Sequence, residues 1–598
     1  MPYRPAVFVT WKELFDELPN HEEIWSFLRT CNRQHTAVLL ARMATHLYID
    51  RFRRDSEQII QTQKYLIVNF LDTEVLRLMK ERIQGSAEYR LAFHLQQVLT
   101  VLKWTIIYSS AVGGIDPGAT QEGRCSLGRC LLKANDLFLS KKMQSEIAAD
   151  RRSPSAKKFM RLQLFLGIGN EINNPPTVTN AVIRSATIFE EIIKNIPVPI
   201  DLNSKLGEAT GVTLDTYLDI TLGVLANYMG RSQEEFVKDP ARAIIDPTKF
   251  LGGKLPAESA QKYWEMESTA AEELAVVLAR EDPIASRQDF TSFRMKPFLR
   301  LDNGNLICVN PGFLQEKLEI GLFWTIVNAL QGDDRRSAFE TWGHLFEHYV
   351  SQIIGTSIAV GVETYFPRPN FKHKKRHHES FDGILVLGRV CVVFECKGGF
   401  LPNPAKYGED LDAFVKAFDA KFAMGHGAGV EQLARKIGQI FAAKPADRRE
   451  LEGIDLSQIE VIVPVMVAQD SAVASFFTIP WLAKTFRDAM RKQGLTRQVV
   501  LTSLLVVHIE ELEDLCTFGR AGKLALSECF LFGGKKGDPR QGHYFVFDDI
   551  LLEFLNVNKI ERLPSRAAEQ KFGDVLDRAC VRLFGRTFEP LPGETSHN

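Results

Sequence analysis

The sequence lacks a charge excess and a disulfide pattern. Its 73 Lys and Arg residues stand against 74 Asp and Glu residues, a formal net charge of -1, so a nucleic-acid partner would have to meet a local basic patch. The nine cysteines are an odd number scattered over the chain, which argues against a disulfide framework and for a reducing compartment. We therefore expect a cytoplasmic protein.

Membrane-spanning and secretory patterns are also missing. The longest apolar candidate covers residues 91–110, but four polar residues interrupt it: His94, Gln96, Gln97 and Lys103. We interpret it as an amphipathic helix and expect no membrane partner. The N-terminal residues have no basic segment leading into an apolar one, so no secretory signal is predicted.

Convincing motifs for ATP hydrolysis or zinc binding are also missing. The Gly-rich fragments GGKLPAES and FGGKKGD lack the spacing of a phosphate-binding loop, so the sequence predicts no ATPase. Cys125 and Cys130, in GRCSLGRC, are loosely spaced and are followed by no second pair or His cluster. Two ordinary thiols are therefore preferred over a zinc site.

The chain of 598 residues changes character near its middle, and its length predicts more than one domain. Residues 1–290 show apolar residues at helical spacing, which predicts an all-α half that senses, docks or oligomerises. From residue 291 strand-like runs alternate with helical ones. This predicts an α/β domain over 291–560, with a mixed sheet covered on both faces. Residues 561–598 are predicted to form a helix packed against that domain, followed by a tail.

The most informative segment is residues 379–398, ESFDGILVLGRVCVVFECKG. Two apolar strand-like runs flank Gly388 and Arg389, and glycine at the first central position suits a two-residue turn of type II′. A two-residue turn fixes the register, so Leu387 is predicted to face Val390.

The same register predicts a pair of acids at the far end of the hairpin. Asp382 would lie opposite Glu395 on one face, provided that no bulge intervenes. Facing like charges destabilise a hairpin, so a divalent cation between them is the natural interpretation. Lys397 shares that face, while Cys396 points into the domain. The alternative is that Asp382 caps a strand and that Glu395 and Lys397 are solvent residues at a strand end.

With these residues the sequence resembles the PD-(D/E)xK nuclease superfamily, whose restriction-endonuclease-like fold surrounds a central mixed sheet with helices. The resemblance implies that Asp382 and Glu395 ligate Mg2+, which Mn2+ can replace. It further implies that the carbonyl of Cys396 adds a ligand and that Lys397 positions or activates the hydrolytic water. Phe381 stands where the family name has proline, a departure that weakens branch assignment more than activity.

Two flanking helical segments extend the resemblance. GHLFEHYV carries Glu347, which by resemblance supplies a further acidic metal contact, with a surface position as an equal alternative. VEQLARKI carries Gln432 and Lys436 one helical turn apart on one face. The resemblance implies a catalytic Gln432 near the phosphate and a nucleic-acid contact for Lys436. Glu340, on the same helix as Glu347, is interpreted as a surface charge.

A basic run, FKHKKRHH, lies just before Asp382. Such a cluster suits the phosphate backbone of a nucleic acid, and a solvated loop is the equally weighted alternative. A zinc site in its histidines ranks below both, because no cysteine lies close by. The candidate nucleic-acid-binding residues are Lys372, Lys374, Lys375 and Arg376.

The sequence thus predicts a metal-dependent endonuclease that hydrolyses phosphodiester bonds, with DNA preferred by resemblance only. A large helical half beside such a domain favours bacterial antiphage or restriction-type defence by fold-level analogy. The helical half is a candidate surface for a partner protein or for self-association. Two alternatives stay open: a repair or RNA-processing nuclease with the same site, and a catalytically inactive nucleic-acid-binding scaffold.

Overall fold

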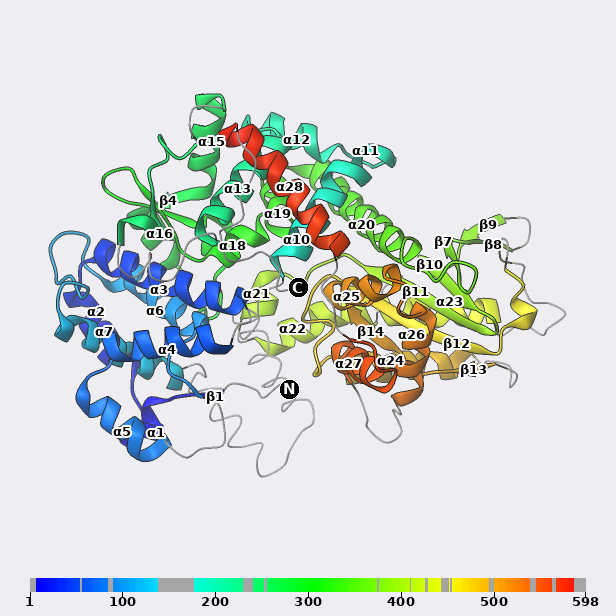
Figure 1. The fold of residues 1–598 in the computed structure, drawn as a ribbon, viewed down its shortest axis with the longest axis horizontal. Coiled ribbons are helices and arrows are strands. Elements are labelled where there is room, and N and C mark those ends of the chain that lie inside the picture. The colour runs from blue at the N-terminus through cyan, green and yellow to red at the C-terminus, as the bar shows by residue number, and fades with distance from the viewer. Residues whose placement is uncertain are drawn as a thin grey trace.

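The computed structural model describes most of the chain and shows a largely helical protein with two mixed β-sheets (Figure 1). No helix among the described residues combines the length and the apolar character needed to cross a membrane. The described residues are 7–53, 56–83, 90–137, 177–229, 240–251, 255–373, 376–408, 410–424, 429–441, 451, 454–493, 499–537, 545–561 and 566–585.

Helices of the N-terminal region lie at one end of the molecule, and the larger sheet lies at the other (Figure 1). Two short parallel strands, β1 (Val7–Phe8) and β2 (Arg90–Leu91), accompany the first helices. These helices are α1 (Trp11–Phe15), α2 (His21–Thr30), α3 (Arg33–Arg53), α4 (Ser56–Phe70), α5 (Thr73–Ile83), α6 (Leu95–Tyr108) and α7 (Gln121–Asp136).

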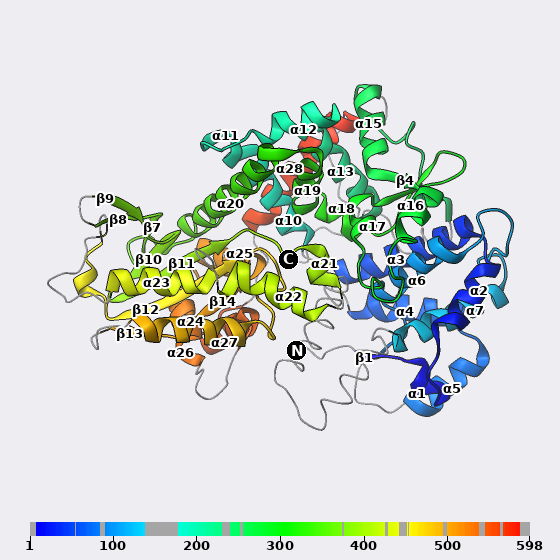
Figure 2. The same ribbon diagram turned by 180° about the vertical axis from the view of Figure 1, so that it is seen from behind.

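The next group of helices lies above the N-terminal helices and reaches toward the larger sheet in the view of Figure 2. It includes a π-helical turn, η2 (Thr187–Ile192), that continues α10. The α-helices are α10 (Val178–Ala186), α11 (Ile193–Asn195), α12 (Leu202–Thr210), α13 (Leu214–Met229), α15 (Ala257–Glu267), α16 (Ala271–Leu278), α17 (Thr291–Met295), α18 (Pro311–Glu316) and α19 (Ile320–Ala329).

Helix α6 differs from the amphipathic helix expected within residues 91–110. The amphipathic interpretation is wrong, because every residue from Leu95 to Ile106 is buried. The polar residues are satisfied inside the protein rather than by water. The Lys103 ammonium lies 2.6 Å from a carboxylate oxygen of Glu281 and donates to the carbonyl of Ser286 at 2.8 Å.

The smaller sheet crosses the domain boundary expected near residue 291. Its strand order is β3-β6-β5-β4, and β5 and β6 form an antiparallel hairpin. Strands β3 and β4 precede residue 290, so residues 1–290 are not all-α as expected. The strands are β3 (Ile244–Ile245), β4 (Ser268–Ala270), β5 (Phe298–Arg300) and β6 (Leu306–Cys308).

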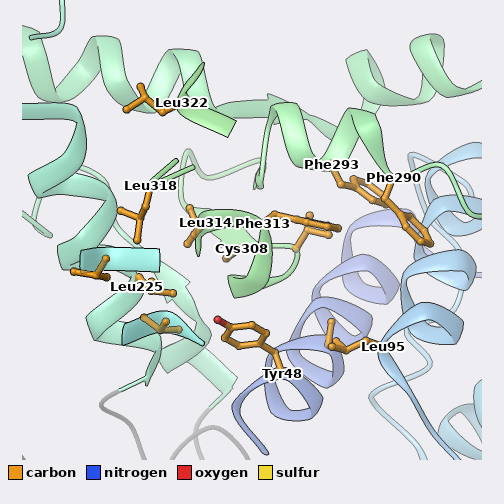
Figure 3. Packing of buried hydrophobic residues seen from close by; sticks show 14 of the residues in the cluster. Tyr48, Leu95, Leu225, Phe290, Phe293, Cys308, Phe313, Leu314, Leu318 and Leu322 are labelled. Atoms are coloured by element: carbon orange, nitrogen blue, oxygen red, sulfur yellow. The ribbon is translucent and has the colours of Figure 1, made fainter. Parts of the chain in front are cut away.

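A continuous hydrophobic cluster runs from the N-terminal helices into one face of the larger sheet. Figure 3 shows part of it, with Phe313 and Leu314 of α18 beside Tyr48 of α3. The Tyr48 hydroxyl donates to Oε1 of Gln315 at 2.5 Å, so the one polar atom of this ring is paired. The two parts of the chain therefore share one core.

The larger sheet is mixed, with the order β7-β10-β11-β12-β13 and with β14 also paired to β12. Strand β10 runs antiparallel to β7 and β11, whereas β11, β12, β13 and β14 are parallel. The strands are β7 (Thr364–Pro367), β10 (Gly383–Leu387), β11 (Val390–Lys397), β12 (Val461–Ala468), β13 (Val500–Leu501) and β14 (Leu505–His508).

Helices cover both faces of this sheet, as predicted (Figure 1; Figure 2). Alternate residues of β11 point to opposite faces, with Phe394 and Cys396 in one cluster and Val393 in the other. The first face is covered by α20 (Gly332–Gly355), α25 (Ile509–Arg520), α26 (Leu526–Lys536) and α27 (Phe547–Val557). The second is covered by α22 (Leu411–Phe418), α23 (Gly429–Phe441) and α24 (Ile479–Gln493).

The C-terminal helix α28 (Arg566–Phe584) was expected to pack against the α/β domain, but its extensive contacts among the described residues are with the N-terminal region. It lies along α10 and α13 of the N-terminal region (Figure 1). A Cβ on Gly223 of α13 would come within 2.5 Å of Leu583, so the two helices meet closely at that glycine. An ion pair between Arg582 and Asp219 at 3.2 Å adds to this contact.

Candidate functional site

The predicted hairpin is present with the predicted register. Five residue pairs join β10 and β11, beginning with Leu387 and Val390 at the turn. Gly388 has a φ of 54°, and Arg389 is not among the residues with positive φ. A type I′ turn needs positive φ at both central positions, so the turn is of type II′, as expected.

The register changes at the far end of the hairpin, just before the first acid. The ladder ends with Gly383 opposite Phe394, and the N–H of Asp382 also donates to the Phe394 carbonyl, at 3.1 Å. Two residues of one strand thus oppose one residue of the other, which is a β-bulge. Asp382 therefore does not pair directly with Glu395 as expected. Its carboxylate instead accepts the N–H of Cys396 at 2.5 Å.

Glu395 is buried between two lysines. Its carboxylate, 1% exposed, has Oε1 at 2.8 Å from Nζ of Lys397 and Oε2 at 3.2 Å from Nζ of Lys436. Lys436 comes from α23, which covers this face of β11. Gln432 lies one turn earlier on α23 and accepts a hydrogen bond from Lys397 at 3.2 Å. The structure thus brings Glu395, Lys397, Gln432 and Lys436 together.

Asp382 joins this group through the same lysine, since Nζ of Lys436 lies 4.0 Å from Oδ1 of Asp382. Burial raises the pKa of Asp382 well above its ordinary value, and the neighbouring charge of Glu395 raises it further. Lys436 lowers the same pKa. An ammonium group therefore lies within reach of both acids, and the divalent cation that the sequence predicts between them stays a prediction. We call Asp382, Glu395, Lys397 and Lys436 the acid–lysine cluster.

Glu347 lies near the cluster but has a different partner. It is half-buried on α20, and its charge contributes to the raised pKa of Asp382. Its carboxylate lies 3.2 Å from Nη2 of Arg368. Glu340, on the same helix, is exposed. The metal contact expected of Glu347 stays a prediction.

Arg368 is a site residue that sequence reasoning missed. It has a positive φ of 44°, rare for a residue with a side chain, and its N–H donates to the carbonyl of Asp382 at 3.3 Å. Its Nη2 also contacts the carbonyl of His344 at 3.5 Å. The stretch PRPN indicates only a turn, and Arg368 reaches Asp382 because β7 pairs with β10.

The basic run forms a β-hairpin rather than a loop. Strands β8 (Asn370–His373) and β9 (Arg376–Glu379) pair antiparallel, and Figure 1 shows them beyond β7 and β10. Ser380 donates to the Pro369 carbonyl at 3.2 Å and closes the base of this hairpin. Among the predicted nucleic-acid-binding residues, Lys374 and Lys375 lie outside the described residues, as do the side chains of Lys372 and Arg376.

The oxygen donors at this edge of the sheet are of the kind that hard divalent cations prefer. The carbonyl of Lys397 accepts from Gln469 on the β12 side at 3.1 Å. Successive residues of a strand point their polar groups to alternate sides, so the N–H and carbonyl of Cys396 face Asp382. Two carboxylates and a carbonyl, completed by water, are typical of Mg2+ sites. In the described part of the chain, no group of three or more His, Cys, Asp or Glu side chains has metal-binding geometry.

The nine cysteines are all buried and free, and Cys125 and Cys130 both lie on α7. Burial raises the pKa of Cys130 to about 12. Neither thiol belongs to a metal-binding group in the described part of the chain.

No family model, no curated protein and no solved structure matches this chain. The membership of the nuclease superfamily therefore stays a prediction that rests on the residues and their arrangement.

Proposed function

We propose that the protein is a metal-dependent endonuclease of the PD-(D/E)xK type that hydrolyses phosphodiester bonds of DNA. The observation that carries the proposal is the acid–lysine cluster. Glu395, almost wholly buried, pairs with two lysines at a strand end, and one of these lysines also reaches Asp382. Grouped titratable residues with a strongly shifted pKa are typical of active sites.

The energetics favour a functional role over a structural one. Carboxylates are costly to bury, and apolar residues of similar volume often stabilise a protein as well or better. The cluster also keeps a path to water, because the side chains of Lys397 and Lys436 are 19% and 13% exposed. A polymer substrate would approach at this edge, where β11 extends past the first residue of β10.

The residues of the site would have different roles in the proposed reaction. Asp382, Glu395 and the Cys396 carbonyl would hold Mg2+ or Mn2+, which supplies a water of lowered pKa and neutralises charge on the phosphate. Lys397 would orient the attacking water by donating hydrogen bonds, and Gln432 would hold the Lys397 ammonium in place.

Two further cations would bind the phosphate group. Lys436 already lies beside both acids, and Arg368 offers a planar guanidinium whose Nε has no hydrogen-bond partner among the described residues. Arginine suits phosphate because its fork can donate two parallel hydrogen bonds.

A non-catalytic scaffold is the second candidate, and one observation favours it. Lys397 and Lys436 supply two positive charges for the carboxylates of Asp382 and Glu395. The charge of the cluster is therefore balanced without a metal ion. A protein of this kind would bind nucleic acid without cleaving it.

A plasmid-nicking assay separates the two candidates. Wild type should nick supercoiled DNA with Mg2+ or Mn2+ and not with EDTA. Glu395→Gln should slow nicking by more than about 100-fold, because loss of a metal ligand costs more than loss of a supporting residue. Glu340→Gln, the same change at an exposed position of α20, is the matched control and should nick like wild type.

Unchanged nicking by Glu395→Gln would overturn the proposed site, and DNA binding without nicking by wild type would favour the scaffold. Linear duplex, single-stranded DNA and RNA, tested side by side, distinguish the repair and RNA-processing alternatives. A role in bacterial antiphage or restriction-type defence is proposed by analogy of architecture alone. Phage plating on cells expressing wild type or Glu395→Gln tests it.

A further inference from the structure

A second concave site lies apart from the acid–lysine cluster. A cavity of about 880 Å3 opens where α17, α18 and α19 meet the segments that follow β11, β12 and β14. This volume suits a small organic ligand, and the carboxyl ends of parallel strands are a common place for such ligands. None of the acid–lysine cluster residues lines the cavity.

Aromatic side chains from several segments line this cavity. The rings of Trp324, on α19, and Phe400, after β11, have centroids 6.3 Å apart. Phe313 and Tyr407 are buried and both lie near Arg294, whose guanidinium carbon is 5.2 and 5.4 Å from the two ring centroids. Trp324 and Phe400 are only partly buried, so a planar ring can stack on them.

The charged side chains of the cavity are paired with one exception among the described residues. Arg184, Arg294, Lys317 and Lys406 each form an ion pair with a carboxylate. Nζ of Lys296 has no carboxylate within 4.0 Å in the described part of the chain.

The contact that the structure does give to Lys296 is with a neutral group. Its ammonium donates to the Ser268 carbonyl at 3.1 Å. The remaining acid of the wall, Glu510, lies 3.8 Å from Arg184, so it too has a charged partner. Among the described residues, Lys296 is therefore the cation of the cavity wall that no carboxylate pairs with.

We infer that this cavity binds a nucleotide, with the base on the aromatic walls and the phosphate at Lys296. A ligand with only a ring would leave the lysine unmatched, and one with only an anionic group would leave the aromatic walls unused. The amides of Asn328 and Asn403, which also line the cavity, can pair with the polar edge of a base. This inference is independent of the proposed nuclease activity.

The test is a titration of the full-length protein in EDTA, so that metal-dependent cleavage plays no part. Isothermal calorimetry with AMP, GMP, CMP and UMP should give a dissociation constant below about 100 μM for at least one of them. Adenosine or the matching nucleoside, and inorganic phosphate, should each bind at least about 10-fold more weakly than that nucleotide.

Variants then locate the site. Lys296→Ala and Trp324→Ala should each weaken binding about 10-fold or more, which corresponds to about 1.4 kcal/mol. Lys249→Ala is the matched control, because the Lys249 side chain is 84% exposed and outside the cavity, and it should bind like wild type. If thermal unfolding shows that Lys296→Ala is not folded, Lys296→Gln replaces it.

Three results would overturn the inference. They are no nucleotide binding at about 1 mM, phosphate binding as tightly as the nucleotide, and unchanged binding in both cavity variants.

Discussion

Two clusters of buried charged side chains in this molecule differ in how much water can reach them. The acid–lysine cluster has its counterpart in the Arg184 cluster, which consists of Arg184 on α10, Glu319 beside α19 and Glu513 on α25. The guanidinium of Arg184 lies 2.8 Å from Glu319 and 2.7 Å from Glu513. Tyr349 of α20 donates to Glu513 at 2.6 Å, and Gln469 donates to Glu319 at 2.5 Å.

The Arg184 cluster is held by several hydrogen bonds, and its three charged side chains are only 4–6% exposed. It joins three helices that are far apart in the sequence. The acid–lysine cluster uses flexible lysines with partial access to water. We infer that the Arg184 cluster holds the fold together, and we propose that the acid–lysine cluster binds a metal ion. Four predictions test this distinction, in order of decreasing effect.

Removal of the arginine should have the largest effect on stability. Arg184→Met leaves Glu319 and Glu513 buried without their partner, so the free energy of unfolding should fall by about 3–5 kcal/mol. Urea denaturation followed by circular dichroism measures the change. Arg336→Met is the control, because the Arg336 side chain is 78% exposed, and it should lose little. A loss below about 1 kcal/mol for Arg184→Met would contradict the structural role.

Magnesium should stabilise the protein through the acid–lysine cluster alone. At 100 times its dissociation constant, a ligand that binds only the folded state adds about 2.7 kcal/mol to the free energy of unfolding. We expect this gain for wild type and Glu340→Gln, and none for Glu395→Gln. Thermal unfolding with Mg2+ and with EDTA provides the measurement. An equal gain in Glu395→Gln would place the metal elsewhere.

The raised pKa of Asp382 should make the metal-free protein less stable as the pH rises. A carboxyl group whose pKa is raised on folding stabilises most below its unfolded pKa, near 3.9, and loses that contribution as the pH passes its folded pKa. Asp382→Asn mimics the neutral form and keeps an oxygen that can accept the Cys396 N–H. In EDTA its stability relative to wild type should therefore increase from pH 5 to pH 8.

Urea denaturation across this pH range gives the comparison. A difference between Asp382→Asn and wild type that does not change with pH would show that Asp382 stays ionised throughout.

Arg368 should affect the substrate and not the metal. Arg368→Ala removes the guanidinium proposed to bind phosphate, and kcat/KM for DNA cleavage should fall by about 10-fold. Stabilisation by Mg2+ should stay as in wild type. If Mg2+ no longer stabilises this variant, Arg368 instead holds the carboxylates of Asp382 and Glu347 in position for the metal.

The parts of the site that depend on residues close together in the sequence could be predicted. The glycine turn between two apolar runs was enough to predict the register of β10 and β11, because a two-residue turn leaves one way to pair the strands. The helical spacing of Gln432 and Lys436 was likewise enough to place both residues on one face, and both reach the motif.

The parts that depend on distant pairing could not be predicted. The bulge at Asp382 adds a residue to one strand, and no periodicity reveals it in advance. Arg368 reaches Asp382 only through the pairing of β7 with β10. The smaller sheet and α28 both join segments on either side of residue 290, where a change in local pattern indicated a boundary.

The position of α28 has a consequence for how the protein forms on the ribosome. Helix α28 can cover α10 and α13 only after the segment around Leu583 has left the ribosome. This happens long after α10 and α13 have been synthesised. Until then, the apolar residues of α13 that α28 covers remain exposed on the nascent chain. Such exposed apolar surface promotes aggregation, so the covering of α13 by α28 removes this risk only late in synthesis.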